Sequence, residues 1–190
     1  MKWRWGLLTL GVFLLMSSSW VSTGCGGGGG GGGPTAPPPP SSGISFSSDS
    51  SSGSNSIRLS SGGGSGSLFI LDVDAQSVTD LYGVSFILHY PANLLAYSNN
   101  SETEGTFLSE NGSVDTDLQV TERQAGEVIV GISRLGEIPG AAGSGTLLSL
   151  EFNRRASGTG RMEMMDHDAL DSFGDVQVEV TWVSGTVTVR

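Results

Sequence analysis

Two groups of aspartates are the first residues in this sequence whose types and spacing could do chemistry. Asp72 and Asp74 form a D-x-D pair, and a second group surrounds His167 and contains Asp166, Asp168, Asp171 and Asp175. Clustered carboxylates can hold calcium, which takes several oxygen ligands. Neither group has the D-x-[DN]-x-[DN]-G spacing of a calcium-binding loop. We therefore expect solvated turns rather than a metal site, with a hairpin turn over residues 172–175.

Catalytic patterns are absent from the sequence. There is no G-x-S-x-G segment, and no spaced pair of acids stands out from the acidic background. The two histidines, His89 and His167, lie far apart, and the chain has a single cysteine, so no transition-metal site is predicted. We expect neither an enzyme nor a cofactor.

Cys25 is the single cysteine, and the residues before it have the pattern of an export signal. Lys2 and Arg4 precede an apolar run over 6–16, and mostly small, polar residues follow up to Gly24. A positive start, a short apolar core and a small-residue cleavage region are typical of a signal peptide. The apolar run is also shorter than the roughly 20 residues that a membrane-spanning helix needs.

The segment Val-Ser-Thr-Gly-Cys at 21–25 resembles the lipobox of bacterial lipoproteins. This resemblance implies that residues 1–24 are a lipoprotein signal peptide and that Cys25 is the lipidated first residue of the mature protein. The alternative is an ordinary secretory signal that leaves a free thiol, which is a liability in an oxidising compartment. In a cell with an inner and an outer membrane, Gly26 stands where an aspartate would resemble an inner-membrane retention signal. We therefore expect a cell-envelope lipoprotein at the outer membrane or cell surface.

Residues 25–43 predict a tether. Eight consecutive glycines at 26–33 are followed by a proline-rich run. Polyglycine stays flexible, whereas a proline run forms an extended spacer. A coil estimate gives residues 26–43 a mean reach of about 25 Å. The segment would hold a domain away from a surface without packing on it.

The charge balance excludes several kinds of partner. Of the nine Lys and Arg residues, Lys2 and Arg4 lie in the signal segment, which leaves seven arginines against 19 acidic residues and a net charge near −12. Nucleic acid and anionic lipid both require a basic patch. We therefore expect no nucleic-acid partner, and membrane contact only through a lipid anchor.

Residues 44–190 predict a single all-β domain. Short segments with a period of two are separated by Gly, Ser, Asn and Asp clusters. The clearest strands cover 68–74 and 82–90, and weak ones cover 44–48 and 57–60. Further strands are predicted over 94–98, 118–122, 127–133, 146–153, 161–165, 176–182 and 186–190. No segment has an amphipathic helical pattern. These features predict an antiparallel sandwich whose core includes Phe69, Leu71, Val84, Phe86, Leu88, Val130, Leu148, Leu150 and Val187.

Four segments, in this order, resemble the cohesin domain. They are LFILDVDAQSVTDLYGVSFILHYPANLLAY at 68–97, GEVIVGISRLGE at 126–137, GSGTLLSLEFN at 143–153 and ALDSFGDVQVEVTWVSGTVTV at 169–189. The resemblance covers residues 57–190. It implies a jelly-roll β-sandwich of about nine strands. Members of the family bind dockerin modules, and related sandwiches bind polysaccharide.

The resemblance also implies where a partner would bind. The dockerin face of cohesins is formed mainly by the strands that match 82–90 and 127–134. Alternation along these strands places Val84, Phe86 and Leu88 inward. The candidate partner-binding residues are Ser85, Ile87, His89, Ile129, Gly131, Ser133, Arg134 and Leu135. Known cohesins often carry Asn or Asp where this chain has Gly83 and Ser85, so the usual dockerin specificity is not implied.

Three functions remain open from the sequence. The first is a surface-tethered cohesin-like module that binds a dockerin-bearing partner in polysaccharide binding or degradation. The second is a carbohydrate-binding module acting directly on polysaccharide, for which only Trp182, Tyr82 and Tyr97 could supply exposed aromatic rings. The third is an adhesive surface domain that does not use dockerin.

Overall fold

The computed structural model describes residues 43–50 and 53–190. The predicted signal peptide, Cys25 and almost all of the tether lie outside the described residues. Those assignments therefore stay predictions.

Twelve strands and one short helix are present in the described residues. They are β1 (Ile44–Ser48), β2 (Ser56–Gly63), β3 (Leu68–Leu81), β4 (Gly83–His89), β5 (Leu95–Tyr97), β6 (Thr103–Glu104), α1 (Thr106–Ser109), β7 (Thr116–Gln124), β8 (Glu127–Arg134), β9 (Ala141–Arg154), β10 (Gly158–Leu170), β11 (Thr181–Val183) and β12 (Gly185–Val189). The helix has four residues. No helix in the described residues is long and apolar enough to span a membrane.

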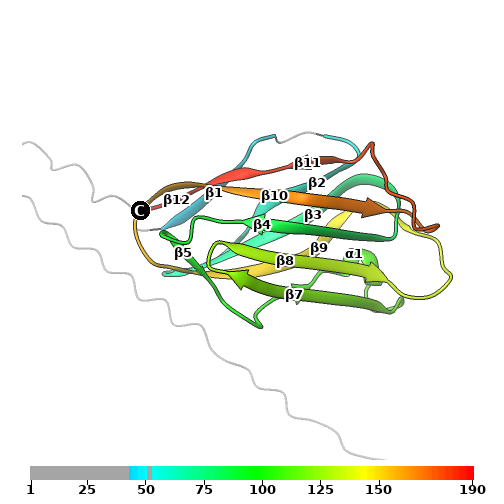
Figure 1. The fold of residues 1–190 in the computed structure, drawn as a ribbon, viewed down its shortest axis with the longest axis horizontal. Coiled ribbons are helices and arrows are strands. Elements are labelled where there is room, and N and C mark those ends of the chain that lie inside the picture. Colours follow the sequence, from blue (N-terminus) through cyan, green and yellow to red (C-terminus); the bar gives the residue numbers. More distant parts are fainter. Residues whose placement is uncertain (1–42, 51–52) are drawn as a thin grey trace, which may run out of the picture. The chain divides into compact units, whose positions relative to one another are not determined.

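The strands form two stacked sheets (Figure 1). The front sheet has the order β1-β12-β10-β4-β8-β7, and the back sheet has the order β11-β2-β3-β9-β5, with β6 also pairing with β9. Neighbouring strands are antiparallel. The exception among the described pairings is β11, which runs parallel to β2. The predicted all-β antiparallel sandwich is confirmed, with twelve strands instead of about nine.

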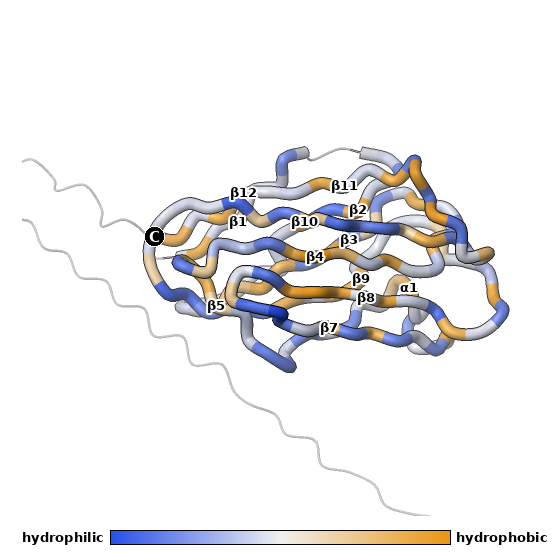
Figure 2. Tube along the Cα trace, in the orientation of Figure 1, coloured by the Kyte–Doolittle hydropathy of each residue, from blue (hydrophilic) through white to orange (hydrophobic). Residues whose placement is uncertain are grey.

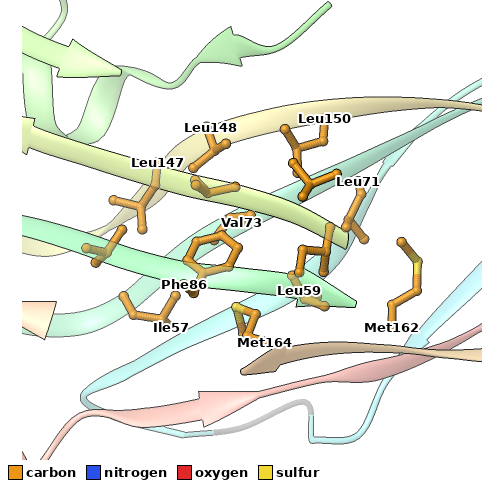
Figure 3. Packing of buried hydrophobic residues seen from close by; sticks show 14 of the residues in the cluster. Ile57, Leu59, Leu71, Val73, Phe86, Leu147, Leu148, Leu150, Met162 and Met164 are labelled. Carbon is orange, nitrogen blue, oxygen red and sulfur yellow. The ribbon is translucent and has the colours of Figure 1, made fainter. Parts of the chain in front are cut away.

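The core lies between the two sheets (Figure 3). Alternate side chains of β4 and β8 are buried, all of them apolar except Arg134 at the end of β8, and the side chains between them are half-buried or exposed. An antiparallel sheet with one face on the core produces this alternation. All nine predicted core residues are buried, each with at most 3% of its surface exposed.

The strand predicted over 176–182 is wrong for most of its length. The segment 176–180 alternates as a strand would, yet only Thr181–Val183 form one. The reason is that residues 176–180 have no neighbouring strand to pair with. Val176 forms only an isolated bridge with Leu170, and the pairing of this segment with β2 covers residues 181–183 alone. Residues 171–180 are therefore a loop between β10 and β11.

The first and last strands lie side by side at one edge of the front sheet. Ile44 of β1 pairs with Val189 of β12. The Arg190 N–H donates a hydrogen bond of 2.9 Å to the Gly43 carbonyl. The chain therefore enters and leaves the domain at the same end of the sandwich (Figure 1).

Candidate protein-docking face

The docking face is the solvent side of strands β10, β4, β8 and β7 in the front sheet. Strands β4 and β8 pair along their whole length, from Gly83↔Ser133 to His89↔Glu127. Because successive side chains of a strand point to opposite faces, every second side chain points away from the core and toward solvent. The structure thereby brings together six of the predicted binding residues: Ser85, Ile87, His89, Ile129, Gly131 and Ser133.

A row of apolar side chains crosses the middle of this face. Ile87 pairs with Ile129 on one side and with Met165 on the other. Met165 is 47% exposed and Ile129 is 40% exposed, while Ile87 is half-buried. These three apolar residues are neighbours in register on three adjacent strands, whereas single exposed apolar residues are common on any protein. The backbone trace coloured by hydropathy shows apolar stretches along β4 and β8 (Figure 2).

Sequence reasoning missed Met165. Its strand was predicted, but the pairing that places β10 beside β4 was not. A bulge between Met165 and Asp168 interrupts this pairing, and Asp166 within it has a positive φ of 46°. No periodic pattern in the sequence reveals that register.

Beside the apolar row lies a hollow of about 250 Å³. Its floor is formed by the small residues Gly83, Ser85, Gly131 and Ser133, and Asp117 and Gln119 of β7 line one side. A Cβ on Gly131 would meet nothing within 4 Å, whereas a Cβ on Gly83 would lie 2.9 Å from the Ser133 Cβ. Gly83 is therefore required by close packing of the strands, and Gly131 leaves the hollow open.

The opposite side of the apolar row carries charge. The His89 imidazole lies 3.9 Å from the Glu127 carboxylate, and Arg123 donates a hydrogen bond of 2.5 Å to Glu127. Desolvation opposes ionisation of Glu127, but hydrogen bonds from Gln124 and Arg123, together with the positive charge of Arg123, outweigh it. The pKa of Glu127 is therefore lowered from its ordinary value, and the carboxylate stays ionised at neutral pH.

Arg134 does not belong to the face, and its predicted outward position is wrong. Arg134 is the next residue after Val130 and Ile132 on the buried side of β8, so its side chain points inward, and the residue is only 3% exposed. The guanidinium donates hydrogen bonds to the carbonyls of Leu108 (2.9 Å) and Pro139 (2.5 Å). It also pairs with the carboxylate of Glu110. Leu135, the next residue, is 49% exposed at the end of β8.

The three candidate aromatic residues Tyr82, Tyr97 and Trp182 do not form a flat platform for sugar rings. Tyr97 is buried, and the Tyr82 hydroxyl donates a hydrogen bond of 2.5 Å to the Gly136 carbonyl. One face of the half-buried Trp182 ring is stacked on His167, with ring centroids 4.5 Å apart, and its ring also contacts Phe86. Stacking on pyranose rings needs an open ring face, and His167 already occupies one face of Trp182.

The carboxylates of Asp72 and Asp74 on β3 accept hydrogen bonds from neighbouring hydroxyl groups. Ser60 and Thr146 donate hydrogen bonds to Asp74, and Ser149 donates one to Asp72, at 2.6–2.8 Å. Within residues 43–50 and 53–190, no three His, Cys, Asp or Glu side chains come together as a metal site. The predicted turn at 172–175 is present, and its first hydrogen bond joins the Asp171 N–H to the Asp175 carbonyl at 3.0 Å.

Comparison with solved structures identifies the fold. A non-cellulosomal cohesin from the archaeon Archaeoglobus fulgidus matches 69% of this chain and 88% of its own, with 21% identity and a TM-score of 0.52. A type II cohesin domain from the cellulosome of Acetivibrio cellulolyticus matches 72% of this chain and 95% of its own, with 14% identity and a TM-score of 0.59. The sixth cohesin of scaffoldin B from the same organism, solved in complex with a dockerin, matches 67% and 96%, with 18% identity and a TM-score of 0.52.

The described domain therefore has the cohesin fold, and the resemblance seen in the sequence is confirmed at that level. No protein-family model matches the chain. No curated protein sequence matches it either. At these identities the likeness shows the architecture, and the binding residues must be argued from this chain's own surface.

Proposed function

We propose that this protein is a surface-tethered binding module whose docking face takes a dockerin-type module of another protein. The observation that carries the proposal is the apolar row of Met165, Ile87 and Ile129, which lies on an otherwise polar sheet face. Interfaces between proteins have an apolar centre and a polar rim. The hollow beside Gly131 and the charges around Glu127 provide such a rim.

The fold supports a protein partner of this class. Solved cohesins with the same architecture are seen in complex with dockerins. A polysaccharide ligand has less support, because one ring face of Trp182 is stacked on His167 and Tyr97 is buried. We propose that a role in polysaccharide binding or degradation comes through the partner.

The tether completes the proposal. A lipid on Cys25 would hold the protein at the outer membrane or cell surface, and the segment up to residue 43 would give the domain its reach. We propose that the domain binds a partner and does not catalyse a reaction, because solved cohesins with its fold are seen in complex with dockerins.

The test is a titration of the full-length protein with purified dockerin modules from proteins of the same cell, followed by calorimetry. We expect Ile129→Asp and Ile87→Asp to weaken binding by roughly 30-fold or more, because binding energy concentrates in a few central residues. Both variants should keep the far-ultraviolet circular dichroism of the wild type, since neither side chain is part of the buried core.

Leu68→Asp provides the matched control. Leu68 is half-buried on the outer side of the back sheet, so the same change there should leave the affinity unaltered. If no dockerin module binds the wild type, or if the two isoleucine variants bind as tightly as Leu68→Asp, the proposed function is wrong.

A further inference from the structure

The loop between β10 and β11, residues 171–180, exposes apolar side chains that the fold does not use. Phe173 and Val178 are each 87% exposed, and Val176 is 51% exposed. None of the three belongs to the buried core or to the half-buried residues that pack against it. Apolar side chains gathered in one exposed segment indicate an interaction site.

Hydrogen bonds hold this loop in one conformation. Asp171 accepts hydrogen bonds from the N–H groups of Phe173 and Asp175, each 2.9 Å long. Ser172 donates to the carboxylate of Asp80, and the Gln177 side chain donates to the Asp80 carbonyl at 2.8 Å. Because the loop is already ordered, displaying Phe173 costs little further entropy when a partner binds.

The loop adjoins the docking face. Leu170 lines the hollow of that face and forms a bridge with Val176 of the loop. On the other side of β10, a groove of about 240 Å³ is lined by Asp168 and Trp182 and by Val176 and Val178 of the loop. Asp168 pairs with Ser85 on the docking face. A partner that covers the face therefore reaches the loop without a gap.

The negative charge around the loop disfavours some of the partners that could bind it. Residues 162–189 contain six acidic side chains and no Lys or Arg. A second copy of the chain would bring the same acidic loop against this one, and like charges oppose that contact. An anionic lipid surface is disfavoured for the same reason. The loop also lies at the opposite end of the sandwich from Gly43 and Arg190, where the chain enters and leaves (Figure 1).

We infer that the β10–β11 loop is a second docking element for the protein that binds the docking face. Phe173 and Val178 enter an apolar recess of that partner, and Lys or Arg side chains around the recess meet Asp175 and Glu179. This inference rests on the proposed function, and it adds a contact outside the sheet face that selects which partner is held.

The test compares full-length variants in titrations with the same purified dockerin module. We expect Phe173→Ser to raise the Kd about tenfold or more, as removal of an interface anchor does. The melting temperature should stay within about 2 °C of the wild type, because an exposed side chain contributes little to stability. Ile70→Thr, a half-buried apolar position on the outer side of the back sheet, should change neither quantity.

A second variant tests the charge. Asp175→Asn combined with Glu179→Gln should weaken binding about threefold at low salt and leave it equal to the wild type in 0.5 M salt, because exposed charges are screened there. Equal affinity of this variant and the wild type at low salt would overturn the cationic partner surface.

The outcomes separate the two proposals. If Ile129→Asp weakens binding as expected while Phe173→Ser binds as the wild type does, the loop is not a docking element and the proposed function stands. If Phe173→Ser instead removes self-association in sedimentation, or binding to phosphatidylglycerol vesicles, the occupant is a second copy or a membrane and the inference is overturned. If the wild type binds no dockerin module, both proposals fail.

Discussion

Arg134 and Glu110 form an ion pair that joins the end of β8 to the residue just after helix α1. The arginine side chain is 2% exposed and the glutamate side chain 56% exposed. Arg134 also supplies hydrogen bonds to two carbonyl groups, those of Leu108 and Pro139. The arginine is therefore a structural residue that holds α1 and the β8–β9 loop together.

Replacing Arg134 should destabilise the domain. Arg134→Ala leaves the carbonyls of Leu108 and Pro139 without donors, and we expect it to lower the free energy of unfolding by about 2–4 kcal/mol. Urea denaturation measures this change. Glu110→Gln should cost less than about 1 kcal/mol, because that carboxylate is solvated. If the two variants lose similar free energies of unfolding, the ion pair with Glu110, and not the hydrogen bonds to the two carbonyls, holds α1 and the β8–β9 loop together.

The direction of side chains on β4 can be tested by a pair of neighbours. Phe86 is 1% exposed in the core, and Ser85 is exposed on the docking face. Phe86→Ala should cost roughly 3–5 kcal/mol, which corresponds to a fall of about 10 °C in melting temperature. Ser85→Ala should stay within about 0.5 kcal/mol. If both variants lower the melting temperature by a similar amount, the strand faces the other way, since a shift of one residue reverses every side chain.

Asp80 makes stability depend on pH in the acid range. The Gly140 N–H donates a hydrogen bond of 2.8 Å to its carboxylate, and Ser172 donates another. These bonds stabilise the ionised form, and the pKa of Asp80 is lowered from its ordinary value of 3.8. A depressed pKa in the folded state contributes stability above the unfolded-state pKa, and this contribution is lost as pH falls through the folded-state pKa.

Asp80→Asn should therefore melt below the wild type at pH 6, and the two melting temperatures should converge as the pH falls below about 3.8. Asparagine suits the position, because residue 80 has a positive φ of 52° that asparagine tolerates. A difference that stays constant between pH 6 and pH 2.5 would mean that the charge of Asp80 does not contribute.

Lipidation at Cys25 is the prediction on which the tether depends. The wild type expressed in its own cell should partition into the detergent phase, and Cys25→Ala should stay in the aqueous phase. Mass spectrometry of the mature N-terminus measures the acyl chains directly. A soluble wild type that begins at a residue other than Cys25 would contradict the assignment.

Sequence periodicity predicted those parts of the fold in which one sheet face is buried. The inward positions of Val84, Phe86 and Val130 follow from simple alternation. Alternation also predicted a strand over 176–180, but there the backbone has no strand to pair with and forms a loop. Arg134 was predicted to lie on the binding face at the end of its strand, although alternation points it inward. Long-range pairing and buried ion pairs depend on tertiary contacts, which period alone does not reveal.

The edge position of β1 has a mechanical consequence. Any pull on the chain that precedes Gly43 enters the sandwich through β1, whose five residues pair only with β12. Peeling β1 away would expose Phe46, which packs on Phe69. Strands β4 and β8 lie beyond β12 and β10 in the sheet. Under tension the load therefore reaches the edge first, and the first strand would yield before the face that holds a partner.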